Sequence, residues 1–470
     1  MTKEPMQYQL NISGIHFDLL RHHLYPGDNL EAVAVVLCGR LNHKDVHKLL
    51  VHEIVLIPYT ECERTSDYVS WKTDRIKSLL EKILKYDYAI LKIHSHPGGY
   101  EQFSSLDDES DSKLFSSVFG WANSDFPHGS AIMLPDGRIF GRIFHPDLRT
   151  DALDKISVVS DRISIWNYSN GFSPEIEIGK RTAQAFGEGT FDKLKQLKIG
   201  VVGCSGTGSP VIEQLVRLGI GKLVIVDPDK VELKNLNRIL NTKRSDAISH
   251  RQKVLVLKEA ILAFDLGTEI EAYPTNLYGS ISCLKNLATC DILFGCVDSV
   301  DGRDLLNRLS TYYLIPYFDL GIKLEADGIG GISKIVGTVH YVQPGKSSLL
   351  SRSMYDSEDL KASGLLRKYP DQFPDMVKNS YIKNINVNRP AVISVNMMIA
   401  SYGVNEFLNR IHQYKTDACI DFAQSTIDLT EGCFIHVSED RLKEDSFLKS
   451  KVGKGDCKIF LELVELTTAL

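Results

Sequence analysis

The sequence predicts an α/β protein in which a mixed α/β domain precedes a Rossmann-like doubly wound parallel sheet. Strand-like apolar runs alternate with helical periodicity along most of the chain, and a glycine-rich turn follows a buried strand near its middle. The 470 residues also exceed what one hydrophobic core usually organises, which indicates several domains. Hydrophobic residues make up 43% and charged residues 24%, as in ordinary globular proteins.

Charge, hydropathy and cysteine usage exclude several classes of protein. The formal net charge of -6 is small for this length, so nothing favours nucleic-acid or membrane binding. The first residues lack the pattern of a signal peptide, and the longest apolar stretches are too short to span a bilayer. Nine cysteines without paired spacing are typical of reduced thiols. We therefore expect a cytoplasmic protein.

The N-terminal elements predict a first domain over residues 1–149. The strand-like runs are EAVAVVLCG, HEIVLIPY, YAILKIHSH and GSAIMLPDGRIFGRIF, and one helical segment lies around residues 70–86. The last of these runs predicts a hairpin over residues 129–144 with Asp136-Gly137 at its turn. The polar stretch 150–189 has weak periodicity, which predicts a linker and an N-terminal extension of the next domain.

A second domain is predicted over residues 190–412. The strand LKIGVVG is followed by the helical pattern PVIEQLVRLG, the strand KLVIVD, a helix around residues 253–263, and the strands EIEAYP and CDILFGCVD. Alternation of this kind predicts a doubly wound parallel sheet. Residues 413–470 contain two further strand-like runs, CFIHVS and CKIFLELVEL, which predict a small C-terminal β segment.

The segment IHSHPGGYEQFSSLDDESD carries a candidate metal site. Alternation along a strand places His94 and His96 on the same face, and Asp107 follows a glycine-rich turn. Two imidazoles and a carboxylate leave the fourth position of a zinc ion open, as catalytic zinc requires. A lone H-x-H pair is more often a pair of exposed polar residues without a ligand. The spacing of both histidines relative to Asp107 is therefore what favours a metal site.

The pattern H-S-H-P-x6-S-x2-D resembles the JAMM (MPN) metalloprotease motif, which is found in deubiquitinase-like isopeptidases. The resemblance covers about the first 145 residues. It implies that His94, His96 and Asp107 hold zinc and that Ser104 helps to stabilise the tetrahedral oxyanion. It also implies an MPN (JAB) fold for this domain.

A JAMM-type centre also needs a general base. Glu31, at the start of EAVAVVLCGR, is the candidate, and the resemblance implies that it shuttles protons. The run from Glu31 to Gly39 is a residue longer than the family pattern, so Glu53 and Glu61 are kept as weaker candidates.

The segment VVGCSGTGSPVIEQL predicts a phosphate-binding turn. It lies where a strand turns into a helix, so that backbone N–H groups and the helix N-terminus face a phosphate. The turn alone would also fit a dinucleotide-binding dehydrogenase. However, Ser205 replaces the second glycine of G-x-G-x-x-G and leaves Gly203, Gly206 and Gly208, whereas that second glycine is the one that lets a pyrophosphate approach the backbone.

Charged residues after the next strands favour adenylation over hydride transfer. Cations neutralise a triphosphate and a carboxylate holds Mg²⁺, which adenylation needs and hydride transfer does not. The candidate residues are Asp227 and Asp229 in VIVDPDKVELKNLNRI, Asn235 and Arg238 in the same segment, Lys253, and Asp298 in FGCVDSVDGR.

The pattern D-x-D-x-V-x-x-x-N-L-N-R, together with the glycine turn, resembles the ThiF/MoeB/HesA superfamily, the adenylating core of ubiquitin-activating enzymes. The resemblance runs from about residue 181 to 410. The roles that it implies are ribose binding for Asp227, ATP binding for the glycine turn and Asp229, phosphate contacts for Asn235, Arg238 and Lys253, and Mg²⁺ binding for Asp298. It further implies a homodimer in which Arg181 reaches the ATP of the partner subunit.

Two departures from that superfamily modify the expectation. Ser348 and Ser351 stand where many relatives have the first C-x-x-C pair of a structural zinc site, so we expect no zinc in this domain. No cysteine lies between Ile315 and Ala418, where thioester-forming relatives carry one. Adenylation without an internal thioester is therefore the expectation.

Together the two resemblances imply a bifunctional enzyme. The first domain would trim a ubiquitin-like precursor, and the second would use ATP to adenylate its Gly-ending C-terminus, with a ubiquitin-conjugating-enzyme-like protein as a further partner. Two alternatives stay open: a peptide-modifying adenylyltransferase, and a non-catalytic MPN and nucleotide-binding scaffold that assembles partners.

Overall fold

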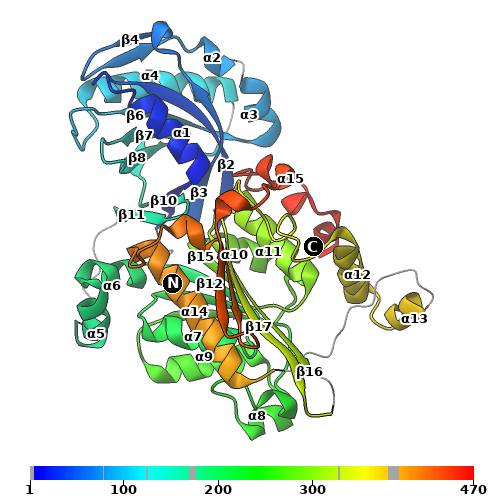
Figure 1. Cartoon of the computed structure of the whole chain (residues 1–470). Helices are drawn as coiled ribbons and strands as arrows, with labels where there is room; N and C mark the ends of the chain where they lie inside the picture. Colours follow the sequence, from blue (N-terminus) through cyan, green and yellow to red (C-terminus); the bar gives the residue numbers. More distant parts are fainter. Residues whose placement is uncertain are drawn as a thin grey trace. The chain divides into compact units, whose positions relative to one another are not determined.

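The computed structural model describes residues 5–77, 79–122, 125–168, 176–326, 329–378 and 391–469. The chain divides into two compact units. The first contains Met1–Gly171, Thr311–Leu314 and Ser450–Glu462, and the second contains Phe172–Ser310, Ile315–Lys449 and Leu463–Leu470. Both units are α/β, as the sequence predicts (Figure 1). In the described part of the chain, no helix is both long enough and apolar enough to cross a membrane.

The first unit is built on a mixed nine-stranded sheet. In sheet order its strands are β11 (Ile163–Asn167), β10 (Lys155–Val159), β1 (Gln7–Ser13), β3 (Val46–Leu56), β2 (Val33–His43), β6 (Ala89–Ser95), β7 (His128–Met133), β8 (Ile139–Phe144) and β9 (Thr150–Ala152). The remaining elements are β4 (Cys62–Arg64) and β5 (Val69–Trp71), which form a small second sheet, and the helices α1 (Gly14–Leu24), α2 (Asp74–Lys77), α3 (Leu80–Tyr86) and α4 (Ser105–Ala122).

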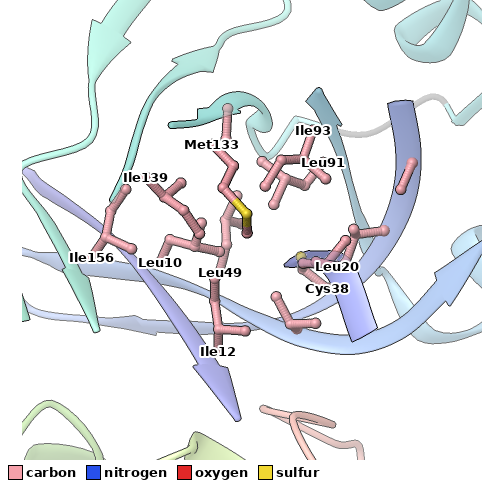
Figure 2. Close-up of a cluster of buried hydrophobic side chains, with 14 of the residues drawn as sticks. Leu10, Ile12, Leu20, Cys38, Leu49, Leu91, Ile93, Met133, Ile139 and Ile156 are labelled. Atoms are coloured by element: carbon pink, nitrogen blue, oxygen red, sulfur yellow. The ribbon is translucent and has the colours of Figure 1, made fainter. Parts of the chain in front are cut away.

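The two faces of this sheet carry separate apolar cores. Along β2, Ala34 and Val36 belong to one core while Val33 and Val35 belong to the other, because successive strand residues point to opposite faces. Figure 2 shows the first core, to which α1 and most strands contribute. The predicted hairpin is confirmed as β7 and β8, and Gly137 in its turn has a φ of 88°.

Two expectations for the first domain differ from the structure. The helix expected around residues 70–86 begins at Asp74, because β5 occupies Val69–Trp71, and Ser78 lies outside the described residues. The expected linker 150–189 begins with β9, β10 and β11, which extend the sheet, while its residues 169–175 lie outside the described part. β10 pairs with β1, whose sequence is remote, so local periodicity could not reveal it.

The second unit confirms the doubly wound sheet. In sheet order its strands are β14 (Glu269–Tyr273), β13 (Lys222–Val226), β12 (Lys198–Val202), β15 (Ile292–Gly295), β16 (Tyr317–Ala326), β17 (Ile332–Val342), β18 (Gln424–Asp428) and β19 (Cys433–Val437). The strands from β14 to β16 are parallel, and the others are antiparallel. The parallel strands follow the order 3-2-1-4-5, so the topological switch point lies between β12 and β15, where such sheets bind ligands.

Eleven helices belong, wholly or mostly, to the described part of the second unit. They are α5 (Ile176–Phe186), α6 (Glu188–Lys195), α7 (Gly208–Arg217), α8 (Arg244–Ile248), α9 (Lys253–Phe264), α10 (Ile281–Ala288), α11 (Val300–Tyr313), α12 (Ser357–Lys368), α13 (Phe373–Lys378), α14 (Ile393–His412) and α15 (Ser446–Lys449). The longest of these helices in the described part of the chain, α14, contains the apolar run IASYGVNEFLNRI. It packs within its own unit against α7, β16 and β17, while Ile393 and Met397 are exposed.

The C-terminal β segment expected over 413–470 is only partly strand. The run CFIHVS forms β19 and joins the sheet of the second unit through β18. The run CKIFLELVEL forms two 3-10 turns, Phe460–Glu462 and Val464–Ala469, so the expectation of a strand there is wrong. Phe460 and its neighbour Leu461 are both buried, whereas a strand would direct adjacent side chains to opposite faces.

Candidate functional sites

Three predicted metal ligands meet in the first unit. His94 lies in β6, His96 follows the strand directly, and Asp107 lies in the first turn of α4. The Nε2 atoms of the two histidines are 3.2 Å apart, and Asp107 lies 2.9 Å from His94 Nε2 and 3.6 Å from His96 Nε2. All three side chains are buried. Among the described residues, they form the one group of at least three His, Cys, Asp or Glu side chains that could hold a metal.

This geometry fits a tetrahedral zinc ion. Ligand bonds of about 2.0–2.1 Å would separate the ligand atoms by about 3.3 Å, close to the separations in this cluster. The Nδ1 atom of His96 lies 2.8 Å from the carbonyl oxygen of Tyr100, which directs the lone pair of Nε2 towards the cluster. Burial opposes ionisation of Asp107, but hydrogen bonds from His94, His96 and Ser104 outweigh it and hold the pKa of this carboxyl well below its usual range.

Glu31 is the glutamate that the structure places at the histidines. Val33 lies opposite His94 in the antiparallel β2–β6 ladder, so Glu31, two residues earlier, lies beside His96. Its Oε1 is 3.8 Å from His96 Nε2, and its side chain is buried. Burial raises the pKa of Glu31 to about 7, although the neighbouring His96 lowers it.

The two weaker candidates for the general base lie elsewhere. Glu53 forms an ion pair with Lys82 at 2.6 Å, and Glu61 forms one with Arg75 at 2.5 Å. Glu53 lies opposite Leu37 in the β2–β3 ladder, several residues along the strand from the histidines.

Ser104 forms hydrogen bonds with Asp107. Its backbone N–H and its hydroxyl both donate to Asp107 Oδ2, at 2.8 and 2.7 Å. The backbone N–H of Asp107 in turn donates to Ser104 Oγ at 3.1 Å. The hydroxyl is therefore engaged with a candidate ligand, and the oxyanion role that the resemblance implies stays a prediction.

The predicted glycine turn connects β12 to α7 in the second unit. Gly203 has a φ of 90°, and a Cβ there would lie 2.4 Å from the carbonyl oxygen of Cys296. A Cβ on Gly208 would lie 1.7 Å from Gly203 O, and one on Gly206 would lie 2.9 Å from the side chain of Arg238. Backbone therefore approaches Gly203 and Gly208 too closely for a side chain, whereas the atoms near Gly206 belong to side chains that can move.

A pocket of about 420 Å³ opens beside this turn, at the carboxyl ends of β12, β13 and β15. It lies at the topological switch point, as expected for an open parallel sheet. Of the predicted residues, those that line it are Gly203, Asp227, Asp229, Asn235, Arg238, Lys253 and Asp298. The tertiary structure thus brings the predicted cations and carboxylates together.

Asp227 and Lys253 form the buried floor of the pocket. The carboxylate of Asp227 accepts hydrogen bonds from the backbone N–H groups of Cys204 at 2.7 Å and Asp229 at 2.8 Å. Lys253 Nζ lies 2.8 Å from Asp229 and 3.8 Å from Asp227. Burial raises the pKa of Asp227, and the ammonium group of Lys253 lowers it.

Asn235, Arg238 and Asp298 also line the pocket. Asn235 is buried, and its Oδ1 accepts a hydrogen bond from the backbone N–H of Glu232 at 3.1 Å. Arg238 Nη1 donates to the carbonyl of Lys234 at 3.0 Å. Asp298 follows β15 and is exposed.

Arg181 is exposed on α5, where its Nη1 donates to Gln184 Oε1 at 3.0 Å. It does not line the pocket beside the glycine turn of its own chain. Its role across a twofold interface stays a prediction.

Comparison with known families agrees with the predicted order of the two domains. Residues 179–438, more than half of the chain, match the ThiF family. The chain belongs to the ThiF family. Residues 15–133 match the prokaryotic homologs of the JAB domain, so a JAB domain precedes the ThiF domain as the sequence predicts.

Curated relatives of the chain include ubiquitin-like modifier-activating enzyme 5. The protein from Caenorhabditis elegans is 26% identical over 196 residues, which cover 37% of this chain and 43% of the relative. The protein from Bombyx mori is 26% identical over 192 residues, which cover 37% of this chain and 46% of the relative. The chain therefore spans less than half the length of these relatives.

Solved structures of similar fold include E. coli MccB with succinimide and selenomethionine-containing PaaA. The MccB structure has a TM-score of 0.42 and 19% identity, covering 56% of this chain and 71% of MccB. The PaaA structure has a TM-score of 0.42 and 19% identity, covering 58% of this chain and 88% of PaaA. At this identity the likeness concerns the fold alone.

One wall of the pocket beside the glycine turn was not anticipated from the sequence. Tyr278 and Asp301 line it, and both contact Arg367 of α12. The guanidinium of Arg367 lies 3.5 Å from the centroid of the Tyr278 ring, and its Nε donates to Asp301 at 2.6 Å. These residues belong to no local motif, so the sequence contained no signal for them.

Ser348 and Ser351, the two serines expected in place of a cysteine pair, form hydrogen bonds with each other and with Asp445. The hydroxyl of Ser348 donates to Asp445 Oδ2 at 2.6 Å, and its backbone N–H donates to Ser351 Oγ at 2.9 Å. Nearby, Arg352 forms a buried ion pair with Glu439 at 2.9 Å.

Proposed function

We propose that this protein is a bifunctional enzyme of a ubiquitin-like protein pathway. Its ThiF domain adenylates the C-terminal carboxylate of a Gly-ending ubiquitin-like protein, and its JAB domain is a zinc-dependent (iso)peptidase that processes that protein. The observation that carries the adenylation is the pocket in which Asp227, Arg238, Lys253 and Asp298 converge beside the glycine turn.

In the adenylation step, the substrate carboxylate attacks the α-phosphorus of ATP and pyrophosphate leaves. A pocket of about 420 Å³ is within the size range of small-molecule sites. The backbone N–H groups of the glycine turn and the N-terminus of α7 face the phosphates. Arg238 and Lys253 would offset the charge that develops on the leaving pyrophosphate, and Asp227 would accept hydrogen bonds from the ribose. Mg²⁺ held by Asp298 would neutralise further phosphate charge.

In the JAB domain, His94, His96 and Asp107 would hold zinc. Zinc supplies a Lewis acid that polarises a carbonyl and acidifies a bound water. Glu31 Oε1 would accept the proton of the attacking water and deliver it to the leaving amine, since it lies beside His96 in a buried position. Linking the two domains would raise the effective concentration of the trimmed product at the adenylation site.

The adenylation proposal is tested by isotope exchange between pyrophosphate and ATP. Exchange is expected only when a ubiquitin-like protein with a C-terminal glycine is present. Asp298→Ala is expected to abolish the exchange because the proposed Mg²⁺ ligand is lost. Glu259→Ala, which removes a carboxylate from α9 outside the pocket, is the matched control and should exchange normally. Exchange with free amino acids, or binding of a nicotinamide cofactor, would overturn the assignment.

The zinc proposal is tested by metal analysis. The protein is expected to bind one zinc ion in the JAB domain, and His96→Ala is expected to lose it because one of three protein ligands disappears. An unchanged zinc content in this variant would show that His96 does not bind the zinc ion.

The absence of cysteine between Ile315 and Ala418 favours a second candidate for the fate of the adenylate. In that case the adenylated carboxylate, or an adenylated peptide, passes directly to an amine or to the thiol of a separate conjugating-enzyme-like protein. Mass spectrometry of the protein after reaction with ATP and substrate distinguishes the routes, because an internal thioester would leave a mass adduct that reducing thiols remove.

A further inference from the structure

Helix α4 and strand β6 are connected by two successive polar pairs. Asp107 Oδ1 lies 2.9 Å from His94 Nε2, and one turn further along α4, Asp111 Oδ1 lies 2.7 Å from Lys92 Nζ. Two strand residues span about 6.7 Å and one helical turn about 5.4 Å, so the spacing of the strand pair nearly matches that of the helix pair. Side chains from Ile90 and Phe115, the next positions on each element, belong to one apolar core.

The Lys92–Asp111 pair is buried. The side chain of Lys92 is 5% exposed and that of Asp111 is 0% exposed. Removing two charges from water is costly, and the adjoining apolar core shows that hydrocarbon could fill such a position. An ion pair adds specificity of register, because its two charged groups meet in only one alignment of the helix against the strand. Apolar side chains can pack in several alignments.

A third residue connects Asp111 to the loop before α4. Arg142 of β8 lies 2.8 Å from Asp111 Oδ2 and 2.5 Å from Asp108 Oδ1. Its guanidinium lies 3.8 Å from the centroid of the Phe103 ring. Phe103 directly precedes Ser104, the residue whose hydroxyl donates to Asp107. The contacts of Asp111 therefore reach both the strand that carries His94 and the loop that leads to Asp107.

We propose that Asp111 is a positioning residue of the metal centre. By binding Lys92 and Arg142, it sets the register of α4 against β6 and so places Asp107 at the correct distance from the two histidines. The inference rests on the proposed zinc site and names residues that the ligand motif does not contain. It assigns Asp111 no contact with substrate or metal.

The test is zinc affinity, measured on metal-free full-length protein by competition with a chromophoric chelator. The double variant Lys92→Met, Asp111→Leu removes both charges of the pair and keeps similar volume. Zinc affinity is expected to fall about 10–100-fold, as when supporting partners of metal ligands are lost. Co²⁺-substituted protein reports the geometry directly, and the d–d absorption of the variant is expected to change in position and intensity.

Matched variants separate positioning from general stability. Lys82→Met, Glu53→Leu removes another Lys–carboxylate pair of the same unit, away from the histidines, and should bind zinc as the wild type does. The single variant Lys92→Arg retains the positive charge, and its zinc affinity should stay within a few-fold of that of the wild type. The unfolding temperature of the metal-free double variant shows whether it is folded. If it is not, Asp111→Asn replaces it, with weaker zinc binding and an altered Co²⁺ spectrum again expected.

The outcomes distinguish the inference from the proposed function. If the wild type binds no zinc, the proposed function of the JAB domain fails. If the wild type binds zinc and the folded variant binds it with the same affinity and the same Co²⁺ spectrum, the positioning role of Asp111 is overturned while the zinc site stands.

Discussion

At the scale of single residues, Glu31 shows how a strand ladder selects one carboxylate from several. Three glutamates follow or precede apolar runs in this part of the sequence. Glu31 is 4% exposed beside His96, whereas Glu53 and Glu61 form partly exposed ion pairs with cations on neighbouring elements. Its burial and its position in the β2–β6 register make it the general base of the proposed mechanism.

Replacing the general base should separate metal binding from catalysis. Glu31→Gln is expected to retain zinc, because the three ligands remain, and to cleave a ubiquitin-like C-terminal extension about a hundredfold more slowly or worse. Zinc content and single-turnover cleavage measure the two effects. Glu53→Gln is the matched control and should cleave normally. Full activity of Glu31→Gln would show that another residue is the general base.

A second residue, His47, predicts how the stability of the first unit depends on pH. Burial, and then the nearby Arg40, lowers the pKa of His47 to about 3, compared with 6.5 for an exposed histidine. Above pH 6.5 the folded and unfolded forms are both neutral, so stability is highest there. As the pH falls below 6.5 the unfolded state takes up a proton that the folded state does not, and stability is lost until the pH reaches about 3.

At pH 5 this single group is expected to lower the free energy of unfolding by about 2 kcal/mol relative to pH 7. Urea unfolding followed by tryptophan fluorescence measures the effect in the right place, because Trp71, Trp121 and Trp166 all belong to the first unit. His47→Gln cannot take up this proton, so its free energy of unfolding should fall by about 2 kcal/mol less than that of the wild type between pH 7 and pH 5. An equal loss in both proteins would show that other groups cause it.

At the scale of elements, the turn between β12 and α7 is encoded locally. The strand, the three glycines and the helix follow one another within twenty residues, so their relation could be predicted from the sequence. The strands β9 to β11 are the opposite case, because they are short and β10 pairs with a strand about 150 residues earlier.

Gly208→Ala should disrupt this turn. The added methyl group would lie 1.7 Å from the carbonyl oxygen of Gly203, so the chain must move. We expect a loss of stability of a few kcal/mol and weaker ATP binding, measured by thermal unfolding and by nucleotide titration. Gly364→Ala in α12 is the control, because the nearest atom to its added methyl is 3.9 Å away. That variant should be neutral or slightly more stable, since alanine favours a helix more than glycine does.

At the scale of the whole molecule, Arg181 leads to a prediction about assembly. It is exposed on α5 and lies outside the pocket of its own chain, as a residue serving a neighbouring subunit would. We propose a homodimer in which Arg181 completes the phosphate site of the partner. Mixing inactive Arg181→Ala with inactive Asp298→Ala is then expected to restore exchange, because each heterodimer contains one intact pocket.

The restored rate should reach up to about half of the wild-type rate per dimer, since one of two pockets works. Isotope exchange between pyrophosphate and ATP measures it, with subunit exchange verified by a tagged copy. No recovery on mixing, despite verified exchange, would mean that Arg181 acts within its own chain or has no role. Each variant mixed with itself is the control and should stay inactive.

The sequence by itself determined the two-domain α/β order, the candidate metal ligands His94, His96 and Asp107, and the candidate nucleotide-binding residues between Gly203 and Asp298 that line one pocket. Each of these depends on residues that are close in sequence or at the ends of adjacent parallel strands, where spacing alone predicts proximity. The sequence named Glu31 as the candidate base but kept Glu53 and Glu61 beside it, and separating these three required the register of β2 against β6.

Only the tertiary structure decided which remote side chains support these sites. The Lys92–Asp111–Arg142 contacts join a strand, a helix and a second strand. Arg367, from a helix that has no motif, contacts Asp301 in the wall of the candidate nucleotide pocket. Ion pairs of this kind form where packing brings charges together out of water. Their partners are therefore set by three-dimensional register rather than by spacing along the chain.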